Sequence, residues 1–402
     1  MKMARNILTL AIMLLTAMSL HAQLPPRPDA LPPVTNADDA AKAVNMATTL
    51  DEMYRWNRYP TYEVYLAMMQ HFADTYPTLC HIDTIGRTVQ NRLILCAVMH
   101  DEPTDKAGVP QFFYSSTIHG DEVTGYYLML RLIDTLLSGY GSDPHLTALL
   151  RSTEIFINPL ANPDGTYIRG NSNVRYSQRY NANNVDLNRN YPDPFGTDPL
   201  TDIQPENVAM MNYIANHHFR LSANLHGGAE VLNYPWDSFT SAERQHPYSE
   251  WWQQVCRRFV DTARSIQPNI LSDVTTSGHV AGGDWYVISN GRQDYVNQVA
   301  HCLELTMELS TDKILSTSLL NKYWQTFFHP LVGYIAEIHN LPSSGNCTHP
   351  RTQQPKVYPN PTHGTVTIET PTTSTTIDLT DHPAGLHLLT TPDGTVVKVI
   401  KL

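Results

Sequence analysis

The sequence has no long apolar run beyond its first residues. After Leu20, no stretch approaches the roughly 20 consecutive apolar residues that a membrane-spanning helix needs. The apolar run from Ile7 to Leu20 is itself too short to span a membrane. It follows the basic residues Lys2 and Arg5 and is closed by the small residue Ala22. This arrangement predicts a secretory signal peptide over residues 1–22. We therefore expect an exported protein that passes through the periplasm and is secreted or held at the cell surface.

Basic charge is also scarce. The chain holds 27 Lys and Arg against 38 Asp and Glu, and loss of the two basic residues in the signal peptide brings the formal charge from −11 to −13. A net field of this sign argues against binding nucleic acid or an anionic membrane through overall charge. Neither is an expected partner.

Cysteine is sparse as well. The five cysteines are scattered through the chain without the close spacing of a metal site. In an exported protein one or two disulfides are possible, with at least one thiol left over. No cysteine lies in a catalytic pattern, so the chemistry must depend on other side chains.

Amino-acid composition divides the rest of the chain into a leader, a large domain, a linker and a tail. Residues 23–49 form a proline-rich leader, and residues 50–341 alternate strands with helices. That alternation predicts an α/β domain in which a mixed central sheet has helices on both faces. Ser, Pro, Gly and Thr dominate a linker at 342–356, and short β-like runs at 357–402 predict a small all-β tail domain.

The candidate chemistry starts at His119-Gly-Asp-Glu122. A β-rich run (111–118) precedes it, and a run with apolar residues at helical spacing (123–137) follows it. A His at a strand end and a Glu in the next helical turn can face one metal ion. The same His-x-x-Glu pattern recurs at His301-Cys-Leu-Glu304, so the spacing alone is weak evidence. A structural histidine in a turn is the alternative for His119.

Two further strands carry candidate residues. His226 ends a predicted strand (220–225), and the ends of neighbouring strands meet at one edge of a sheet, so His226 is the best third ligand. Glu308 stands in an otherwise apolar strand. A buried, unpaired Glu is costly, so it needs a partner or a function. Near a metal-bound water it would be a general base; the alternative is an ion pair with Lys313.

The polar stretch 171–190 holds groups suited to a substrate carboxylate. Arg179 and Arg189 offer guanidinium forks, and Asn188 adds a neutral donor. Asp186 could orient a metal-bound imidazole from behind. The alternative is a polar surface loop with solvent-exposed salt bridges that contribute little to stability.

Taken together and in this order, the motifs resemble the zinc metallocarboxypeptidases of the carboxypeptidase A/B superfamily across about residues 50–340. The Asp-Leu-Asn-Arg-Asn and His-Gly-Gly forms look most like the carboxypeptidase N/E/D branch. The resemblance implies a carboxypeptidase-like fold and rests on His119-Gly-Asp-Glu122, Asn162-Pro-Asp-Gly165, Asp186-Leu-Asn-Arg-Asn-Tyr-Pro192, Asn224-Leu-His-Gly-Gly228, Tyr234-Pro-Trp-Asp237, Trp285-Tyr286 and Glu304-Leu-Thr-Met-Glu-Leu309.

The resemblance implies a catalytic zinc site for hydrolysis at the C-terminal ends of peptides or proteins. One Zn²⁺ would be bound by His119, Glu122 and His226. Arg179 would polarise the scissile carbonyl and stabilise the oxyanion. Glu308 would activate the zinc-bound water and pass its proton to the leaving amine.

The resemblance also implies how the substrate is held. Asn188 and Arg189 would bind its terminal carboxylate, with Tyr286 closing over it. Asp237 stands where members that prefer basic residues place an acid at the base of the side-chain pocket, and Gln293 also matches that branch. We therefore expect a preference for C-terminal Lys or Arg over a broad or neutral one.

Two features depart from the branch. Asp121 stands where animal members carry Asn or Arg near the substrate. Members of the branch carry a transthyretin-like β domain after the catalytic domain. Here the tail instead resembles the C-terminal sorting domains of type IX secretion cargo, through Tyr358-Pro-Asn-Pro361 and Gly385-Leu-His-Leu388. The resemblance implies that export machinery recognises this tail.

Two other functions remain open. The same site could act as a murein-peptide amidase or carboxypeptidase on diaminopimelate-containing peptides. Alternatively, the scaffold could be an inactive binding module, although the expected ligands and the base are all present.

Overall fold

The computed structural model describes residues 43–101, 108–196, 200, 202–342, 356–358, 362–369, 374–383, 385–390 and 396–401. The expected signal peptide (1–22), most of the expected leader and nearly all of the expected linker lie outside these ranges.

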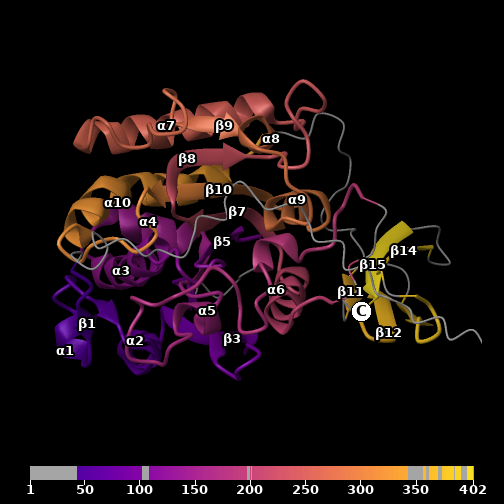
Figure 1. Cartoon of the computed structure of the whole chain (residues 1–402), viewed down its shortest axis with the longest axis horizontal. Coiled ribbons are helices and arrows are strands. Elements are labelled where there is room, and N and C mark those ends of the chain that lie inside the picture. The colour runs from indigo at the N-terminus through magenta and orange to yellow at the C-terminus, as the bar shows by residue number, and fades with distance from the viewer. Residues whose placement is uncertain are drawn as a thin grey trace, which may run out of the picture. The chain divides into compact units, whose positions relative to one another are not determined.

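One mixed sheet of eight strands forms the centre of the described chain, and its strands climb from β3 to β8 in Figure 1. β6, β5, β7 and β10 run parallel, whereas β4 and β8 pair antiparallel with β6 and β10. The mixed α/β sheet expected from the sequence is confirmed. In spatial order the strands are β3 (Cys80–Arg87), β4 (Leu93–Met99), β6 (Glu154–Asn158), β5 (Gln111–Ser116), β7 (Phe219–His226), β10 (Leu303–Ser310), β8 (Ala229–Tyr234) and β9 (His279–Ala281).

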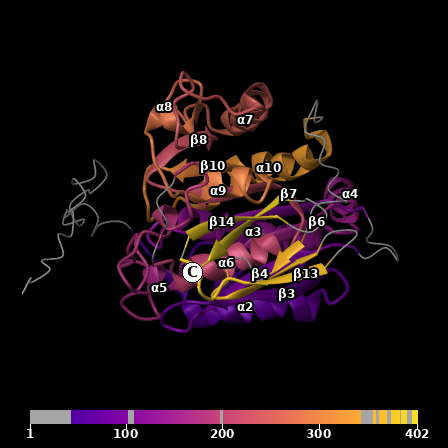
Figure 2. The same cartoon turned by 90° about the vertical axis from the view of Figure 1, so that its right-hand side faces the viewer.

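Helices cover both faces of the sheet, as expected. Successive residues of a strand point to opposite faces, so Phe112 and Tyr114 of β5 join one hydrophobic cluster and Phe113 joins the other. Figure 2 shows the helices and the sheet from the side. The first cluster includes α2 (Tyr62–Thr75), α3 (Thr124–Gly139), α4 (Pro144–Ser152), α7 (Ser249–Ile266) and α10 (Leu320–Ala336); the second includes α6 (Pro205–Ala215) and α9 (Arg292–Gln298).

Side-chain caps fix where two of these helices begin. The Thr61 hydroxyl accepts a hydrogen bond from Val64 N at 3.3 Å at the start of α2. The Asp143 carboxylate accepts from His145 N and Leu146 N at the start of α4. Such caps satisfy backbone N–H groups that have no partner within the helix. The remaining short elements are α1 (Leu50–Met53), α5 (Pro163–Thr166), α8 (Gly282–Trp285), η2 (Leu187–Arg189) and η3 (Glu337–Asn340).

Strands β7 and β10 differ on their two faces. Toward the first cluster both are apolar. On the opposite face both strands carry polar residues. Each polar residue of β7 lies beside one of β10, which gives three rows. The rows are Ser222 with Glu304, Asn224 with Thr306, and His226 with Glu308. Two in-register parallel strands therefore bring a predicted ligand and the predicted base side by side.

The compact unit begins at Ala43 rather than at residue 50. β1 (Met46–Ala47) pairs with β2 (Tyr59–Pro60), and Thr317 N donates to Ala43 O at 2.8 Å. Ala47 is fully buried. The end of the segment interpreted as a leader thus belongs to the folded domain, because Ala47 joins its hydrophobic core.

The tail is all-β, as expected. It contains a three-stranded sheet and a two-stranded one. Apolar residues of both sheets share a small core of Val366, Ile368, Leu379, Val397 and Val399. The strands are β11 (Lys356–Tyr358), β12 (Thr365–Glu369), β13 (Ser374–Asp378), β14 (Gly385–Thr390) and β15 (Val396–Lys401).

Two expectations from the sequence, on membrane-spanning helices and on disulfides, can be compared with the described residues. None of the described helices is long and apolar enough to cross a membrane. Cys80, Cys96, Cys256 and Cys302 are buried and carry free thiols, so no disulfide joins any of these four. Cys347 lies outside the described ranges, so neither of the disulfides that the sequence leaves possible is seen among the described residues.

Candidate active site

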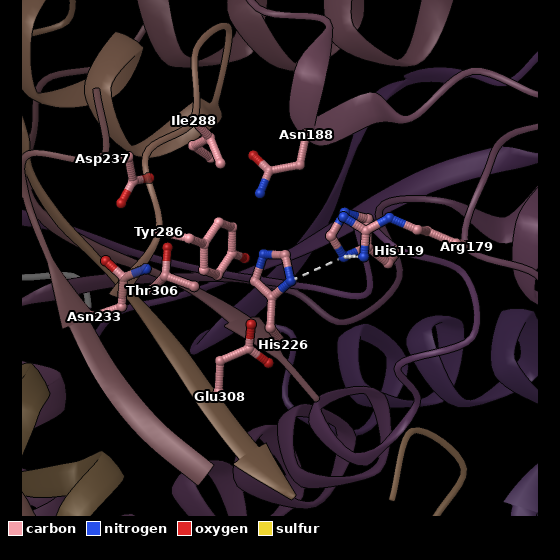
Figure 3. Close-up of a pocket in the computed structure, with 10 residues that line it drawn as sticks. All are labelled: His119, Arg179, Asn188, His226, Asn233, Asp237, Tyr286, Ile288, Thr306 and Glu308. Carbon is pink, nitrogen blue, oxygen red and sulfur yellow. Dashed lines mark hydrogen bonds between the residues drawn. The ribbon is translucent and has the colours of Figure 1, made fainter. Parts of the chain in front are cut away.

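Three buried side chains, those of His119, Glu122 and His226, converge where β5 and β7 end. Figure 3 shows the two histidines of this group. Glu122 Oε1 lies 3.0 Å from His119 Nδ1, Glu122 Oε2 lies 2.8 Å from His226 Nδ1, and the two Nδ1 atoms are 3.1 Å apart. Two imidazole nitrogens and one carboxylate oxygen are the protein ligands of catalytic zinc sites, which leave a fourth position open. The donor set and its spacing fit one zinc ion. Burial lowers the pKa of His226 to about 4, which keeps its imidazole neutral, as a ligand must be.

The local placement of these ligands differs slightly from the prediction. His119 stands three residues beyond the end of β5, and Glu122 lies two residues before α3 rather than in its first turn. The residues around His119 are held by α5 and by Asn162, which caps its start. Asn162 Nδ2 donates to Ile118 O at 3.1 Å, and Thr166 Oγ1 donates to Gly120 O at 2.8 Å.

Each imidazole has a polar partner behind it. His119 Nε2 lies 3.2 Å from Asp186 Oδ1, and His226 Nε2 lies 2.8 Å from the Asn224 amide. Both partners orient their ring: the Asp186 carboxylate accepts from Nε2 of His119 and leaves its Nδ1 for the metal, whereas the Asn224 NH₂ group donates to Nε2 of His226. Asp186 was predicted in this role; Asn224 was not, although its place two residues before His226 on one strand face could have revealed it.

Asp186 also organises the loop predicted to bind substrate. Its Oδ1 accepts from Asn188 N at 2.9 Å, and its Oδ2 accepts from Arg179 Nε at 3.1 Å. Burial alone would raise the pKa of Asp186, but the His119 imidazole and the Arg179 guanidinium hold it well below its usual range. One ionised carboxylate therefore holds a metal ligand, a cation and a backbone N–H.

Two cations face the metal ligand Glu122. Arg179 Nη1 lies 3.5 Å from Glu122 Oε1, and Lys313 Nζ lies 3.2 Å from the same oxygen. Lys313 also pairs with Asp121 at 3.3 Å. Lys313 was considered only as a partner of Glu308; the structure places its ammonium on Asp121 and Glu122 instead. Nothing in the spacing of the sequence indicated that contact.

Glu308 is buried, and among the described residues its Oε2 has no hydrogen-bond partner. It lines the same pocket as both histidines and Arg179. Burial, and then the charge of Glu122, raises the pKa of Glu308 well above its usual range. A carboxylate in this state takes up a proton readily, which suits a group that must accept one and release it.

The pocket extends away from the metal ligands toward an acid. Asn188, Tyr286 and Asp237 line it, as expected. Burial, together with the nearby Asp294 carboxylate, raises the pKa of Asp237 well above its usual range. Gln293 Nε2 donates to Asp237 Oδ1 at 2.8 Å.

The pocket also differs from the prediction at several residues. Among the described residues Arg189 is not part of the lining; its Nη1 donates to Asn188 O at 2.8 Å. Asn233, Thr306 and Ile288 do line the pocket and were missed. Thr306 shares a strand face with Glu308 and could have been found from that spacing.

The rival His-x-x-Glu pattern has a structural explanation. Both carboxylate oxygens of Glu304 accept from the Arg292 guanidinium, at 2.9 and 3.0 Å. Both side chains of this pair are fully buried. Glu304 is therefore committed to an ion pair, and the zinc ligands are those of the first motif.

Comparison with known proteins gives concordant results. The family model described as zinc carboxypeptidase matches residues 65–329. Carboxypeptidase M of Mus musculus is 35% identical over 297 residues, which cover 70% of this chain and 66% of the relative. Carboxypeptidase D of Rattus norvegicus is 33% identical over 298 residues, 71% of this chain but 21% of the relative. The chain thus spans about a fifth of carboxypeptidase D and about two thirds of carboxypeptidase M.

Solved structures share the fold. The crystal structure of thrombin activatable fibrinolysis inhibitor gives a TM-score of 0.62 at 17% identity, covering 71% of this chain and 76% of that one. Carboxypeptidase A from Helicoverpa armigera gives 0.59 at 19% identity, with 70% and 74% covered. The family match over most of the folded domain, joined to a buried His-Glu-His site, leads to one conclusion: the chain belongs to the zinc carboxypeptidase family, whose members are metal-dependent peptide hydrolases.

Proposed function

We propose that this protein is an exported, zinc-dependent carboxypeptidase that removes C-terminal residues from peptides or proteins, with a preference for Lys and Arg. The observation that carries the proposal is the single pocket that joins the His119–Glu122–His226 site and Glu308 to a buried acid, Asp237. Such a pocket can hold the end of a chain, cut it and select its last side chain.

The substrate's terminal carboxylate would lie between the metal ligands and Asp237. The Oδ1 of Asn188 already accepts from Arg292 N at 2.9 Å, so its NH₂ group is left for the substrate. Arg189 lies directly behind Asn188 and supplies positive charge. Tyr286 is half-exposed and its ring points among the residues that line the pocket (Figure 3), where it can cover a bound residue.

The chemistry would be divided among three groups. Zinc, when bound, supplies a Lewis acid for the attacking water and the scissile carbonyl. Arg179 would stabilise the negative charge that develops on that carbonyl oxygen, because its guanidinium faces the pocket beside the ligands. Glu308 would take the proton from the attacking water and deliver it to the leaving amine.

The preference for basic residues rests on the far end of the pocket. A Lys or Arg side chain would bring a positive charge to Asp237 and relieve the cost of ionising a buried acid. An apolar side chain would bring no counter-charge to that acid, whose Oδ1 accepts from the neutral Gln293 amide. The amide oxygens Asn233 Oδ1 and Gln293 Oε1 near Asp237 add acceptors for a cationic end.

The test compares N-blocked dipeptides that end in Arg, Lys, Phe and Glu, with and without a chelator. We expect cleavage that the chelator abolishes and zinc restores, and the highest kcat/KM for Arg and Lys. Equal rates for the four substrates would remove the basic preference. Activity on diaminopimelate-containing peptides but not on Arg-terminated ones would identify a murein-peptide hydrolase instead.

Glu308→Gln tests the proposed base. This nearly isosteric change removes the proton acceptor without touching a metal ligand. We expect kcat to fall by at least about 10²-fold while the zinc content stays at one ion per chain. Retained turnover would remove Glu308 from the mechanism. If the unaltered protein bound zinc and peptides but cleaved none of them, it would be an inactive binding module.

Export is the remaining part of the proposal. Residues 1–22 would direct the chain out of the cytoplasm, and the small β tail (357–402) would be read by export machinery. Deleting residues 1–22 should leave the protein in the cytoplasm, and deleting the tail should stop it in the periplasm with its peptidase activity intact. Secretion of the tail-deleted protein at the normal level would refute the role of the tail.

A further inference from the structure

The Arg292–Glu304 ion pair is enclosed deep in the domain. Arg292 Nε and Nη2 each donate to a different oxygen of Glu304, and both side chains have no exposed surface. The Ser222 hydroxyl donates to Glu304 at 2.8 Å, and the Arg292 guanidinium carbon lies 5.3 Å from the centre of the Phe113 ring. The proposed mechanism uses neither charge. Burying two charges is costly, so the pair calls for an explanation beyond packing.

The pair joins α9 to the strand of the proposed base. Arg292 opens the first turn of α9, and Glu304 lies four residues before Glu308 on the same face of β10. A second link runs in parallel, because Asn297 Nδ2 donates to Glu304 O at 2.8 Å. The two hydrogen bonds between the Arg292 guanidinium and the Glu304 carboxylate fix the relative orientation of the two groups as well as their distance, which a single hydrogen bond does not.

Three consecutive residues of that turn hold two parts of the pocket. Arg292 N donates to Asn188 Oδ1 at 2.9 Å. Gln293 Nε2 donates to Asp237 Oδ1 at 2.8 Å. The Asp294 carboxylate accepts from the backbone N–H groups of Asp237 and Ser238, each at 2.9 Å. A shift of this turn would move the proposed carboxylate donor and the proposed specificity acid together.

We propose that Arg292 and Glu304 are positioning residues for substrate recognition: the buried pair locks the first turn of α9 to β10 and so sets the separation of Asn188 and Asp237 from the catalytic groups. The inference rests on the proposed use of this pocket for a peptide C-terminus. Neither residue touches the substrate. Their effect is on the binding of a terminal residue, not on the metal site.

The decisive variant removes both charges at once. Arg292→Met/Glu304→Leu replaces the pair by apolar side chains, an exchange that buried ion pairs often tolerate without loss of stability. We expect the melting temperature and the zinc content to stay near those of the unaltered protein. KM for Arg-terminated substrates should rise about 10-fold or more while kcat changes by less than about 3-fold, because misplaced binding groups weaken binding more than chemistry. The affinity for the dipeptide Gly-Arg, measured by calorimetry, should fall by the same factor as KM rises.

Arg292→Lys is the second variant, and it decides the matter if the double variant does not fold. It keeps the positive charge but loses the bidentate fork, so it should reproduce the rise in KM. The matched control is Arg258→Met/Glu337→Leu, which removes an ion pair (2.7 Å) between α7 and η3, outside the pocket lining. That control should leave KM and Gly-Arg binding unchanged.

The outcomes separate this inference from the proposed function. If the unaltered protein neither binds Gly-Arg nor cleaves peptides, the proposed function fails. If it does both, and the double variant and Arg292→Lys keep the original KM and affinity, the positioning role is refuted. Loss of zinc with a fall in kcat at constant KM would also refute it, because the pair would then support the metal site instead.

Discussion

At the scale of single residues, Asp186 connects functions that the sequence presents separately. Its two oxygens receive the His119 ring, the Arg179 guanidinium and the Asn188 backbone N–H. An ionised carboxylate is suited to this because it only accepts hydrogen bonds and has several acceptor directions. The metal ligand, the oxyanion partner and the carboxylate donor therefore share one anchor.

Asp186→Asn tests that anchor. The amide keeps one acceptor oxygen but loses the charge and turns a donor toward one of its three partners. We expect the zinc affinity to fall by about 10- to 100-fold, measured by competition with a chromogenic chelator. Asp143→Asn, which alters only the cap of α4, should bind zinc like the unaltered protein. Equal zinc affinity in the two variants would show that Asp186 does not hold His119 in place.

The raised pKa of Asp237 leads to a prediction of how KM for a basic substrate changes with pH. A raised pKa means that the carboxyl stays protonated to a higher pH than usual. Only the ionised form attracts a guanidinium strongly, so KM for an Arg-terminated substrate should fall as the pH rises through this pKa. KM for a Phe-terminated substrate should lack that fall, and the discrimination between the two should shrink at low pH.

Asp237→Asn is the matching variant. It should abolish the difference in pH profile and reduce discrimination for Arg over Phe by roughly 10²-fold, equivalent to about 3 kcal/mol for the loss of a buried charge partner. Parallel KM profiles for the two substrates in the unaltered protein would contradict the assignment of Asp237 to the substrate's basic end.

At the scale of elements, the sequence predicted the long periodic segments well. β5, α3 and β7 lie within two residues of their expected bounds, because buried faces dictate their apolar spacing. β8 was missed. It carries Glu230 and Asn233, whose burial is compensated by distant partners such as the Tyr323 hydroxyl and Gln293. Local pattern cannot reveal such partners, and α9 and α8 are too short to show a period.

The contact between the His119 loop and α5 is an element-scale feature with a direct test. A Cβ on Gly120 would lie 2.4 Å from the backbone carbon of Gly165, a distance that only a shift of one element can relieve. Gly120→Ala should therefore lower the free energy of unfolding by about 1–3 kcal/mol, measured by denaturant unfolding, and weaken zinc binding as the loop moves.

Gly333→Ala is the control. It lies inside α10, where a Cβ meets nothing within 4 Å, so the same change should stabilise the protein by about 0.4–1 kcal/mol. If Gly120→Ala were as stable as this control, the close approach of the loop and α5 would not matter for stability.

At the scale of the whole domain, the sheet explains why motifs far apart in sequence converge. The neighbouring parallel strands β5, β7 and β10 present their carboxyl ends at one edge, so His119, Glu122, His226 and Glu308 could be brought together by strand reasoning alone. Lys313 could not, because its contact with Glu122 depends on how the chain leaves β10. The ion pair of Arg292 with Glu304 could not be found from the strands either, because Arg292 lies on α9, Glu304 lies on the following strand β10, and both side chains are buried.

Zinc should act on the stability of the whole domain, because its ligands join the segment that follows β5 to the end of β7. A ligand that binds only the folded state adds about 4 kcal/mol to the free energy of unfolding at a thousand times its dissociation constant. We therefore expect the chelator-treated protein to melt several degrees below the zinc-loaded one, measured by calorimetry. Glu308→Gln should keep the full zinc-dependent rise, since it leaves the three ligands in place, and His226→Ala should lose it. An equal rise in His226→Ala would mean that zinc stabilises the fold from somewhere other than the three-residue site.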